Sequence, residues 1–201
     1  MANERVQHIW CSASIFSKMA DVFIGFVCEQ AKSDRPVTEY VVYLTTTGGS
    51  PYSGINLYNF MKSLPQKKTV YNMGSVDSAG VQFFLGFDHR FGVDNCSFMV
   101  HQTLLPRSAL PELFNSFDLQ TEGEKLASTD RKTYAIIEKE TQAFAQKPLT
   151  QDLIREAALK TTTYHASEAQ EHGFINAVKR PQLPNEGIFY LTDQYLATLL
   201  G

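Results

Sequence analysis

The chain has 201 residues, of which 43% are hydrophobic and 19% are charged, and its formal net charge is −3. This length and composition indicate a globular protein with one substantial core, so we expect a single domain over residues 1–201. Lys and Arg residues are scattered rather than clustered, which argues against nucleic acid as a partner.

Neither a membrane protein nor a disulfide-stabilised protein is expected. The longest apolar runs, Val22–Cys28 and Phe83–Phe87, are far shorter than the roughly 20 residues that a membrane-spanning helix needs. Polar residues interrupt the N-terminal segment where a signal peptide would have its apolar core. The three cysteines include no close pair, which fits neither a disulfide framework nor a zinc site. We therefore expect a cytoplasmic protein without a metal or another cofactor.

The first half of the chain alternates between strand-like and helix-like segments. Arg5–Cys11 predicts a short strand, and Ile15–Ala31 has hydrophobic residues at three- and four-residue spacing, which predicts an amphipathic helix. Tyr40–Leu44 is a near-continuous apolar run, typical of a parallel strand that is covered on both faces. A further helix, which stops near Pro65, precedes a third strand at Thr69–Met73.

The same alternation continues up to residue 100. Ser78–Phe87 follows a glycine-flanked turn and predicts a buried helix. Arg90–Val93 and Cys96–Val100 then predict two more strands. Strands that are joined by crossover helices in this way predict a layered α/β fold.

Beyond His101 the sequence becomes more polar. Leu113–Gln146 is compatible with a helix and has only sparse hydrophobic residues, so we expect an arm over residues 103–147. Thr150 has the signature of an N-cap for a helix that runs to Lys160.

The last part of the chain predicts three short elements. These are a helix at Ser167–His172 that Gly173 ends, a strand at Phe174–Val178, and a helix at Asp193–Leu200. The last of them lies in a tail, residues 180–201, that begins with two prolines. We expect this tail to be a C-terminal extension on the surface.

Three short motifs follow strand-like runs and should therefore lie at strand ends, where open α/β sheets build their sites. They are Thr46–Ser50, Gly74–Gly80 and Met99–Gln102. Within the second motif, Ser78 lies in a strand–turn–helix context with glycines on both sides, which exposes a hydroxyl as a nucleophile requires. The alternative is that Ser78 only caps the helix that follows.

Main-chain amides and a histidine complete the candidate site. The amides of Gly49 and Ala79 could form an oxyanion hole, and a plain tight turn is the alternative for the Gly-Gly pair. His101 ends a strand at the same sheet edge and could act as a general base, whereas a structural histidine is the alternative. Together these residues suggest a serine hydrolase.

In this order the motifs resemble those of the Clp protease proteolytic subunit (ClpP) family, and His165–Asn176 resembles a fourth motif of that family. The similarity covers roughly residues 5–178. The resemblance implies a ClpP/crotonase-type fold, which is a spiral of β-α units with a protruding helical handle. It also implies a homo-oligomer that hydrolyses peptides or unfolded polypeptides through an acyl-enzyme.

The resemblance assigns roles to the site residues and leaves one role open. Ser78 is implied as the nucleophile, His101 as the base, and Gly49 and Ala79 as the oxyanion amides. The acid of the family's triad falls at Thr161 when counted back from Gly173. A triad aspartate holds the histidine tautomer, and its loss costs on the order of 10⁴ in turnover in a well-studied protease.

Three explanations remain for the missing acid. The hydroxyl of Thr161 could weakly orient the imidazole, Asp77 beside the serine could replace the acid, or the protein could hydrolyse little.

Two further departures concern assembly. The chain starts almost at the first predicted strand and lacks the family's N-terminal axial loop, which serves docking to an ATPase, so an ATPase partner is not expected. The family's handle has a glycine-rich strand for ring-to-ring contact, whereas Leu104–Phe117 contains prolines and no glycine. We therefore expect a homo-oligomer whose form differs from a double heptamer ring.

Three functions are compatible with the sequence. The first is a serine peptidase that works without ATP, and the second is a catalytically weak or inactive ClpP-like protein that binds or scaffolds. The third is a crotonase-type acyl-CoA enzyme, which shares the fold and the oxyanion amides but uses carboxylates. The presence of both Ser78 and His101 argues against the third.

Overall fold

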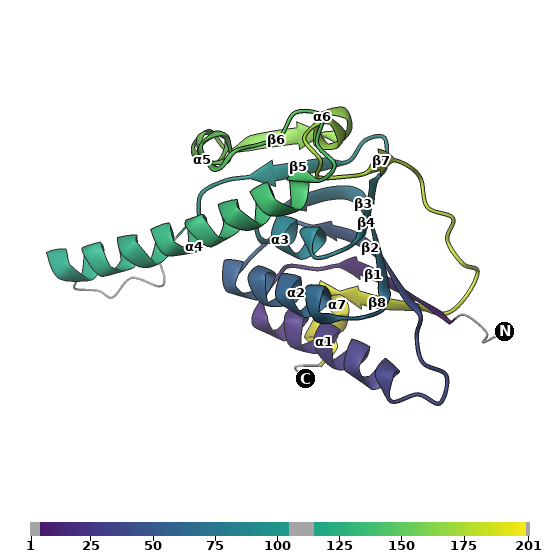
Figure 1. The fold of residues 1–201 in the computed structure, drawn as a ribbon. Coiled ribbons are helices and arrows are strands. Elements are labelled where there is room, and N and C mark those ends of the chain that lie inside the picture. The colour runs from purple at the N-terminus through teal and green to yellow at the C-terminus, as the bar shows by residue number, and fades with distance from the viewer. Residues whose placement is uncertain (1–4, 105–114, 200–201) are drawn as a thin grey trace.

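The computed structural model describes residues 5–104 and 115–199. Its strands are β1 (Val6–Ser12), β2 (Glu39–Thr46), β3 (Lys67–Asp77), β4 (His89–Gly92), β5 (Ser97–Val100), β6 (Thr162–His165), β7 (Ala177–Val178) and β8 (Ile188–Thr192). Its helices are α1 (Ser17–Ala31), α2 (Pro51–Ser63), α3 (Ala79–Leu85), α4 (Ser116–Gln142), α5 (Gln151–Leu159), α6 (Ala166–Glu171) and α7 (Asp193–Thr198). Figure 1 shows the strands as one layer and α1, α2 and α3 as a second layer.

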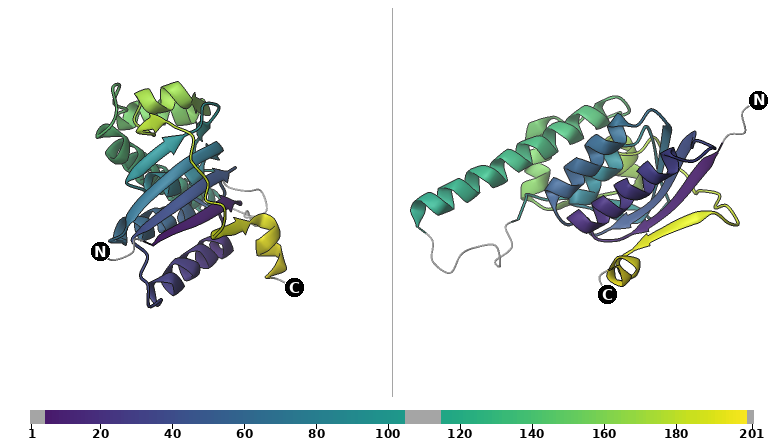
Figure 2. Two further views of the ribbon diagram at one scale, coloured as in Figure 1. Left: turned by 90° about the vertical axis from the view of Figure 1, so that its right-hand side faces the viewer. Right: turned by 90° about the horizontal axis from the view of Figure 1, so that it is seen from below.

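The strands form one sheet in the order β6-β5-β3-β2-β1-β8, and β4 and β7 extend it beside β3. All pairs are parallel except β5 with β6, which is antiparallel. The three N-terminal helices lie on one face, whereas the extended segment 179–187 crosses the other face (Figure 2). This arrangement is the α/β fold that the alternation predicts.

Three details differ from the sequence-based expectation. β3 does not turn at Gly74 but continues to Asp77, because its last three residues pair with β5. The strand predicted at Phe174–Val178 is only Ala177–Val178. The tail is not simply a surface extension, because β8 pairs with β1 and the side chain of Leu191 is fully buried.

Helix α4 forms the arm that extends away from the rest of the molecule in Figure 1. Its first half is solvent-exposed, with Phe117 73% exposed, whereas Tyr134 and Ile137 in its second half are buried. Most of the segment Leu104–Phe117, on which the expectation about ring contacts rests, lies outside the described residues. The second half of α4 is therefore the part that contributes to the site.

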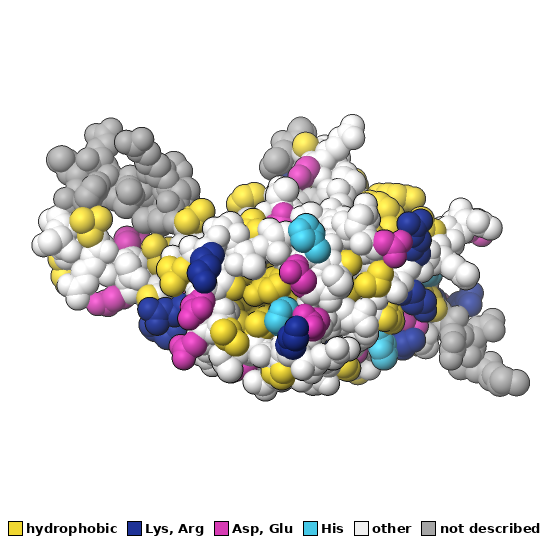
Figure 3. Space-filling view, turned by 90° about the horizontal axis from the view of Figure 1, so that it is seen from above, with side chains coloured by type: hydrophobic (Ala, Val, Ile, Leu, Met, Phe, Trp, Pro, Cys, Tyr) yellow, Lys and Arg dark blue, Asp and Glu magenta, His cyan; other side chains and the backbone are white. Residues whose placement is uncertain are grey.

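The surface carries charges of both signs side by side. Figure 3 shows this on the face that includes α5, β6 and α6, where acidic, basic and hydrophobic side chains alternate. This mixture is consistent with the small net charge of −3. No helix among the residues that the structure describes is long and apolar enough to cross a membrane.

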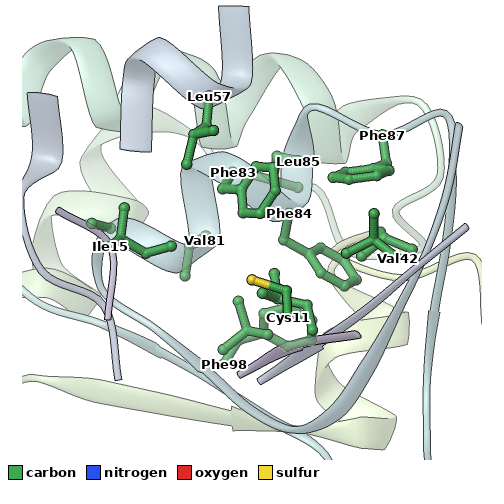
Figure 4. Close-up of a cluster of buried hydrophobic side chains, with 14 of the residues drawn as sticks. Cys11, Ile15, Val42, Leu57, Val81, Phe83, Phe84, Leu85, Phe87 and Phe98 are labelled. Atoms are coloured by element: carbon green, nitrogen blue, oxygen red, sulfur yellow. The ribbon is translucent and has the colours of Figure 1, made fainter. Parts of the chain in front are cut away.

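The core lies between the sheet and the helices on its covered face. Every residue of α3 is buried, and Phe83, Phe84 and Phe98 are fully inaccessible to solvent (Figure 4). The rings of Phe84 and Phe98 meet edge to face at 4.8 Å between centroids. Because α3 begins directly after Ser78, this packing also fixes the position of the candidate nucleophile.

A buried ion cluster anchors the second half of α4 to the sheet. The guanidinium of Arg90, of which 1% is exposed, donates hydrogen bonds to the carbonyl oxygens of Glu140, Phe174, Gly173 and Phe87. The carboxylate of Glu140 accepts hydrogen bonds from the Tyr58 hydroxyl at 2.7 Å and from Lys62 Nζ at 2.9 Å. These partners compensate for removing both charges from water.

The Glu140 carboxylate should make the protein sensitive to acid. Burial favours a higher pKa, but the hydrogen bonds from Lys62 and Tyr58 and the nearby cations outweigh it and lower the pKa of Glu140. A carboxyl whose pKa is lowered by folding stabilises the protein above its unfolded pKa of about 4.3, and this contribution is lost as the pH falls through the folded pKa. Urea unfolding between about pH 7 and 3 should therefore show a smaller acid-dependent loss of stability in Glu140→Gln than in the wild type. Equal slopes for the two proteins would contradict this prediction.

Candidate active site

Ser78 lies in a strained turn between β3 and α3. Its backbone has φ 54° and ψ −121°, a conformation that is costly for a residue with a side chain. The turn is held by a hydrogen bond from Ser78 N to the carbonyl oxygen of Met99 at 2.8 Å. Although Ser78 occupies the N-cap position of α3, its side chain does not cap the helix. The strained turn instead presents the hydroxyl beyond the end of the sheet, as in the nucleophile turns of serine hydrolases.

His101 faces this hydroxyl. Its Nε2 atom lies 2.8 Å from Ser78 Oγ, which is hydrogen-bond distance, and the side chain is half-buried. The two residues meet because the last residues of β3 pair with β5, and His101 directly follows β5. With its proton on Nδ1, the imidazole can accept the serine proton at Nε2.

The glycine loop after β2 packs tightly against the serine turn. Gly48 and Gly49 have φ 89° and 147°, which side chains rarely adopt. A Cβ atom on Gly48 would lie 2.6 Å from Asp77 O, and one on Gly49 would overlap the carbonyl oxygen of Ile15. Glycines are therefore required at both positions for the loop to approach the turn this closely.

Gly49 and Ala79 line the same pocket as the serine and the histidine. This pocket has a volume of about 240 Å³ and is lined by Ser78, His101, Gly49 and Ala79 together with residues of α2, α3 and α4. Ala79 is the first residue of α3, where amide N–H groups have no partner within the helix. The hydrogen-bonded pair of Ser78 and His101 and the first turn of α3 therefore border one pocket.

Helix α4 supplies one wall of the pocket, which the sequence does not predict. Thr133 and Ile137, one turn apart on α4, line the pocket, and the Thr133 hydroxyl accepts a hydrogen bond from Gln82 Nε2 at 2.7 Å. Thr103, which also lines the pocket, donates from its N atom to the Asp130 carboxylate at 2.8 Å. The four-residue spacing of Thr133 and Ile137 marks one face of a helix, but it does not indicate what that face contacts.

Residues 3–182 match the family model of the Clp protease. The chain belongs to the Clp protease family. It is 28% identical over 169 residues to the ATP-dependent Clp protease proteolytic subunit 2 of Corynebacterium diphtheriae, which covers 81% of this chain and 78% of that protein. It is 26% identical over 168 residues to the proteolytic subunit 3 of Streptomyces coelicolor, which covers 81% of this chain and 72% of that protein.

A solved structure shows the same fold. A ClpP1 mutant from Listeria monocytogenes superposes with a TM-score of 0.72 at 16% sequence identity, over 89% of this chain and 92% of that chain. The family resemblance and the ClpP-like fold expected from the motifs are thereby confirmed. The family match ends at residue 182, so β8 and α7 lie outside it.

Thr161, the position that the resemblance gives to the triad acid, forms no hydrogen bond with His101 among the described residues. β5 and β6 pair Val100 with Thr162, and continuing this register by one residue places Thr161 opposite His101. The Thr161 side chain is exposed, however, and forms no hydrogen bond with His101 within residues 5–104 and 115–199. Thr161 also has φ 53°, which is a rare conformation for a β-branched residue.

Asp77, the other candidate acid, does not bond to the imidazole either. Its Oδ1 atom is buried without a hydrogen-bond partner, although it lies on the residue next to Ser78. In the described part of the chain, nothing accepts a hydrogen bond from His101 Nδ1. The same part of the chain contains no cluster of three or more His, Cys, Asp or Glu side chains that could hold a metal ion.

Proposed function

We propose that this chain is a serine peptidase that hydrolyses peptide bonds through an acyl-enzyme. The observation that carries the proposal is the 2.8 Å contact between Ser78 Oγ and His101 Nε2, at a pocket that Gly49 and Ala79 also line. Membership of the Clp protease family and relatives that are named proteolytic subunits support the same reaction.

The geometry supports a two-step reaction. As Ser78 Oγ attacks the carbonyl carbon of the scissile bond, His101 Nε2 takes the hydroxyl proton, and the amides of Gly49 and Ala79 donate hydrogen bonds to the carbonyl oxygen. His101 then gives the proton to the leaving amine, and the C–N bond breaks to leave an ester on Ser78. Water, deprotonated by His101, hydrolyses this ester and restores the hydroxyl.

We further propose that the substrates are short or unfolded peptides, and that a cytoplasmic homo-oligomer hydrolyses them without an ATPase. The relatives are named ATP-dependent enzymes, so this part of the proposal differs from their names. It is tested by hydrolysis of a fluorogenic peptide by the purified chain without nucleotide or any ATPase. The oligomeric state of the same sample follows from light scattering.

The decisive experiment is labelling with a fluorophosphonate, which reacts with activated serine hydroxyls. We expect the wild type to be labelled, Ser78→Ala to lose all labelling, and His101→Ala to be labelled about 100-fold more slowly, because a general base contributes about 10²–10⁴. Ser33→Ala, at an exposed serine, is the matched control and should be labelled like the wild type. Labelling that persists in Ser78→Ala contradicts the proposal.

A catalytically silent binding or scaffold protein is the second candidate. It is favoured by one observation, the absence of any acceptor for His101 Nδ1 among residues 5–104 and 115–199. Without an acceptor the imidazole tautomer is not fixed, which weakens the base. No labelling of the folded wild type at high protein concentration would favour this candidate over the peptidase.

A further inference from the structure

The C-terminal segment 188–199 is fixed firmly to the body of the protein. β8 runs parallel to β1, and the pairing extends from His8 opposite Ile188 to Ser12 opposite Thr192. The Phe189 ring stacks on Phe26 of α1 at 3.9 Å between centroids with 7° between the ring planes. Figure 2 shows β8 and α7 against the edge of the sheet next to β1 and α1.

This segment places one carboxylate on the loop that follows β1. Asp193, the first residue of α7, accepts hydrogen bonds from Ser14 N at 3.0 Å and from Ser14 Oγ at 3.2 Å. The start of α7 is itself capped, because the Thr192 hydroxyl accepts from Tyr195 N at 3.1 Å. Asp193 therefore accepts hydrogen bonds from both donors of Ser14 from a fixed position.

The residue after Ser14 holds the glycine loop of the candidate site. Ile15 N donates to Gly48 O at 2.8 Å, and Ser50 N donates to Ile15 O at 2.7 Å. These two hydrogen bonds lie on either side of Gly49 in the sequence. Gly49 is so close to Ile15 that a Cβ atom on Gly49 would overlap the Ile15 carbonyl oxygen. The orientation of the Gly49 amide thus depends on where Ile15 lies.

Asp193 and the end of β2, from which this loop emerges, line the same shallow pocket. The pocket has a volume of about 160 Å³ and is lined by Asp193, Ser14 and the threonines 45–47, with Ser12, Ala13 and Ser75. Removing the carboxylate would leave the Ser14 amide without its acceptor and would enlarge this pocket. Both changes loosen the segment that carries Ile15.

We propose that Asp193 is a positioning residue for the oxyanion hole: through Ser14 and Ile15 it fixes the direction of the Gly49 amide. The inference rests on the proposed function only for the role of that amide in catalysis. Asp193 lies outside residues 3–182, the part of the chain that matches the Clp protease family. A segment beyond the family match would then complete the site of this chain.

Hydrogen exchange tests the positioning independently of catalysis. In Asp193→Ala we expect the amides of Ile15 and Ser50 to exchange at least about tenfold faster than in the wild type, because protection depends on local opening. Amides of β5 should not change. Gln194→Ala, an exposed neighbour in the same helix, is the matched control and should exchange like the wild type. Exchange at Ile15 and Ser50 within twofold of the wild type in Asp193→Ala would overturn the proposal.

Kinetics test the consequence for the oxyanion. We expect Asp193→Ala to lower kcat for a fluorogenic peptide about tenfold with KM changed less than twofold. The hydrogen bond from the Gly49 amide stabilises the oxyanion of the transition state, so its loss lowers kcat and leaves substrate binding nearly unchanged. Asp193→Asn, which keeps an acceptor for Ser14, should retain most of the activity. An increase in KM at unchanged kcat would show a merely structural role.

Two results separate this inference from the proposed function. If the wild type is not labelled by the fluorophosphonate, the peptidase proposal fails, while hydrogen exchange still decides whether Asp193 holds the loop. If Asp193→Ala does not fold, Ser14→Ala removes only the Oγ bond and keeps the amide bond. It should then accelerate exchange at Ile15 about threefold, and unchanged exchange would overturn the proposal.

Discussion

Replacing Thr161 with aspartate should raise the rate of peptide hydrolysis by at least about tenfold, and by up to about 10⁴-fold if the new carboxylate reaches the imidazole. Continuing the pairing of Val100 with Thr162 by one residue would place Thr161 opposite His101, and His101 Nδ1 has no acceptor among the described residues. A carboxylate at this position would accept a hydrogen bond from Nδ1–H, fix the tautomer and stabilise the imidazolium that forms during the reaction. The measurement is kcat/KM for a fluorogenic peptide.

The matched control is Thr161→Asn. Thr161 follows the C-cap of α5 with φ 53°, a conformation that asparagine and aspartate adopt more readily than a β-branched residue. Both variants therefore relieve the same backbone strain, and both should raise the free energy of unfolding slightly. Only the aspartate adds the charge, so a rate increase in Thr161→Asp that is absent in Thr161→Asn comes from the carboxylate.

Equal rates in the two variants would contradict the expected effect. They would show that position 161 does not act on His101 despite the strand register. Combining Thr161→Asp with Ser78→Ala should abolish hydrolysis, because the gain depends on the serine. Activity that persists in this double variant would come from another group or a contaminant.

The sequence predicts the parts of the fold that depend on local patterns. Tyr40–Leu44 is an almost uninterrupted apolar run and forms the centre of β2, where all five side chains are buried. Thr150 caps α5 as its spacing to Leu153 indicates, and its hydroxyl accepts from Leu153 N. Ser78 and His101 lie within hydrogen-bond distance because each follows a strand that ends at the same edge of the sheet.

Elements whose position depends on distant partners are not predicted. β6 and β8 are short and only partly buried, so neither shows a clear hydrophobic period. The position of β8 depends on its pairing with β1, about 180 residues earlier, and β6 ends beside β5 because Thr162 pairs with Val100, the residue before His101. The sequence marks position 161 only through the family resemblance, and it gives no sign that Asp193 contacts Ser14.

Replacing Arg90 with methionine should lower the free energy of unfolding by about 3–5 kcal/mol. This is the cost of removing one partner of a buried ion pair and leaving the other charge buried. Burial lowers the pKa of Arg90 to about 10, an effect that the nearby Glu140 carboxylate partly offsets, so the guanidinium stays charged at neutral pH. Its loss leaves the carbonyl oxygens of Glu140, Phe174 and Gly173 without these donors.

These bonds connect the end of α4 with the turn after α6. Losing them should therefore loosen the second half of α4 and change the pocket that this helix lines. Because Thr133 and Ile137 of α4 line the pocket of Ser78, Arg90→Met should also lower labelling of Ser78 under conditions where the protein is still folded. Urea unfolding measures the stability, and Arg155→Met, at an exposed arginine, is the control with an expected change within about 0.5 kcal/mol. If the free energy of unfolding falls by less than about 1 kcal/mol in Arg90→Met, water molecules replace the hydrogen bonds of the guanidinium. The buried side chains Tyr134 and Ile137 would then be the main contacts that hold α4.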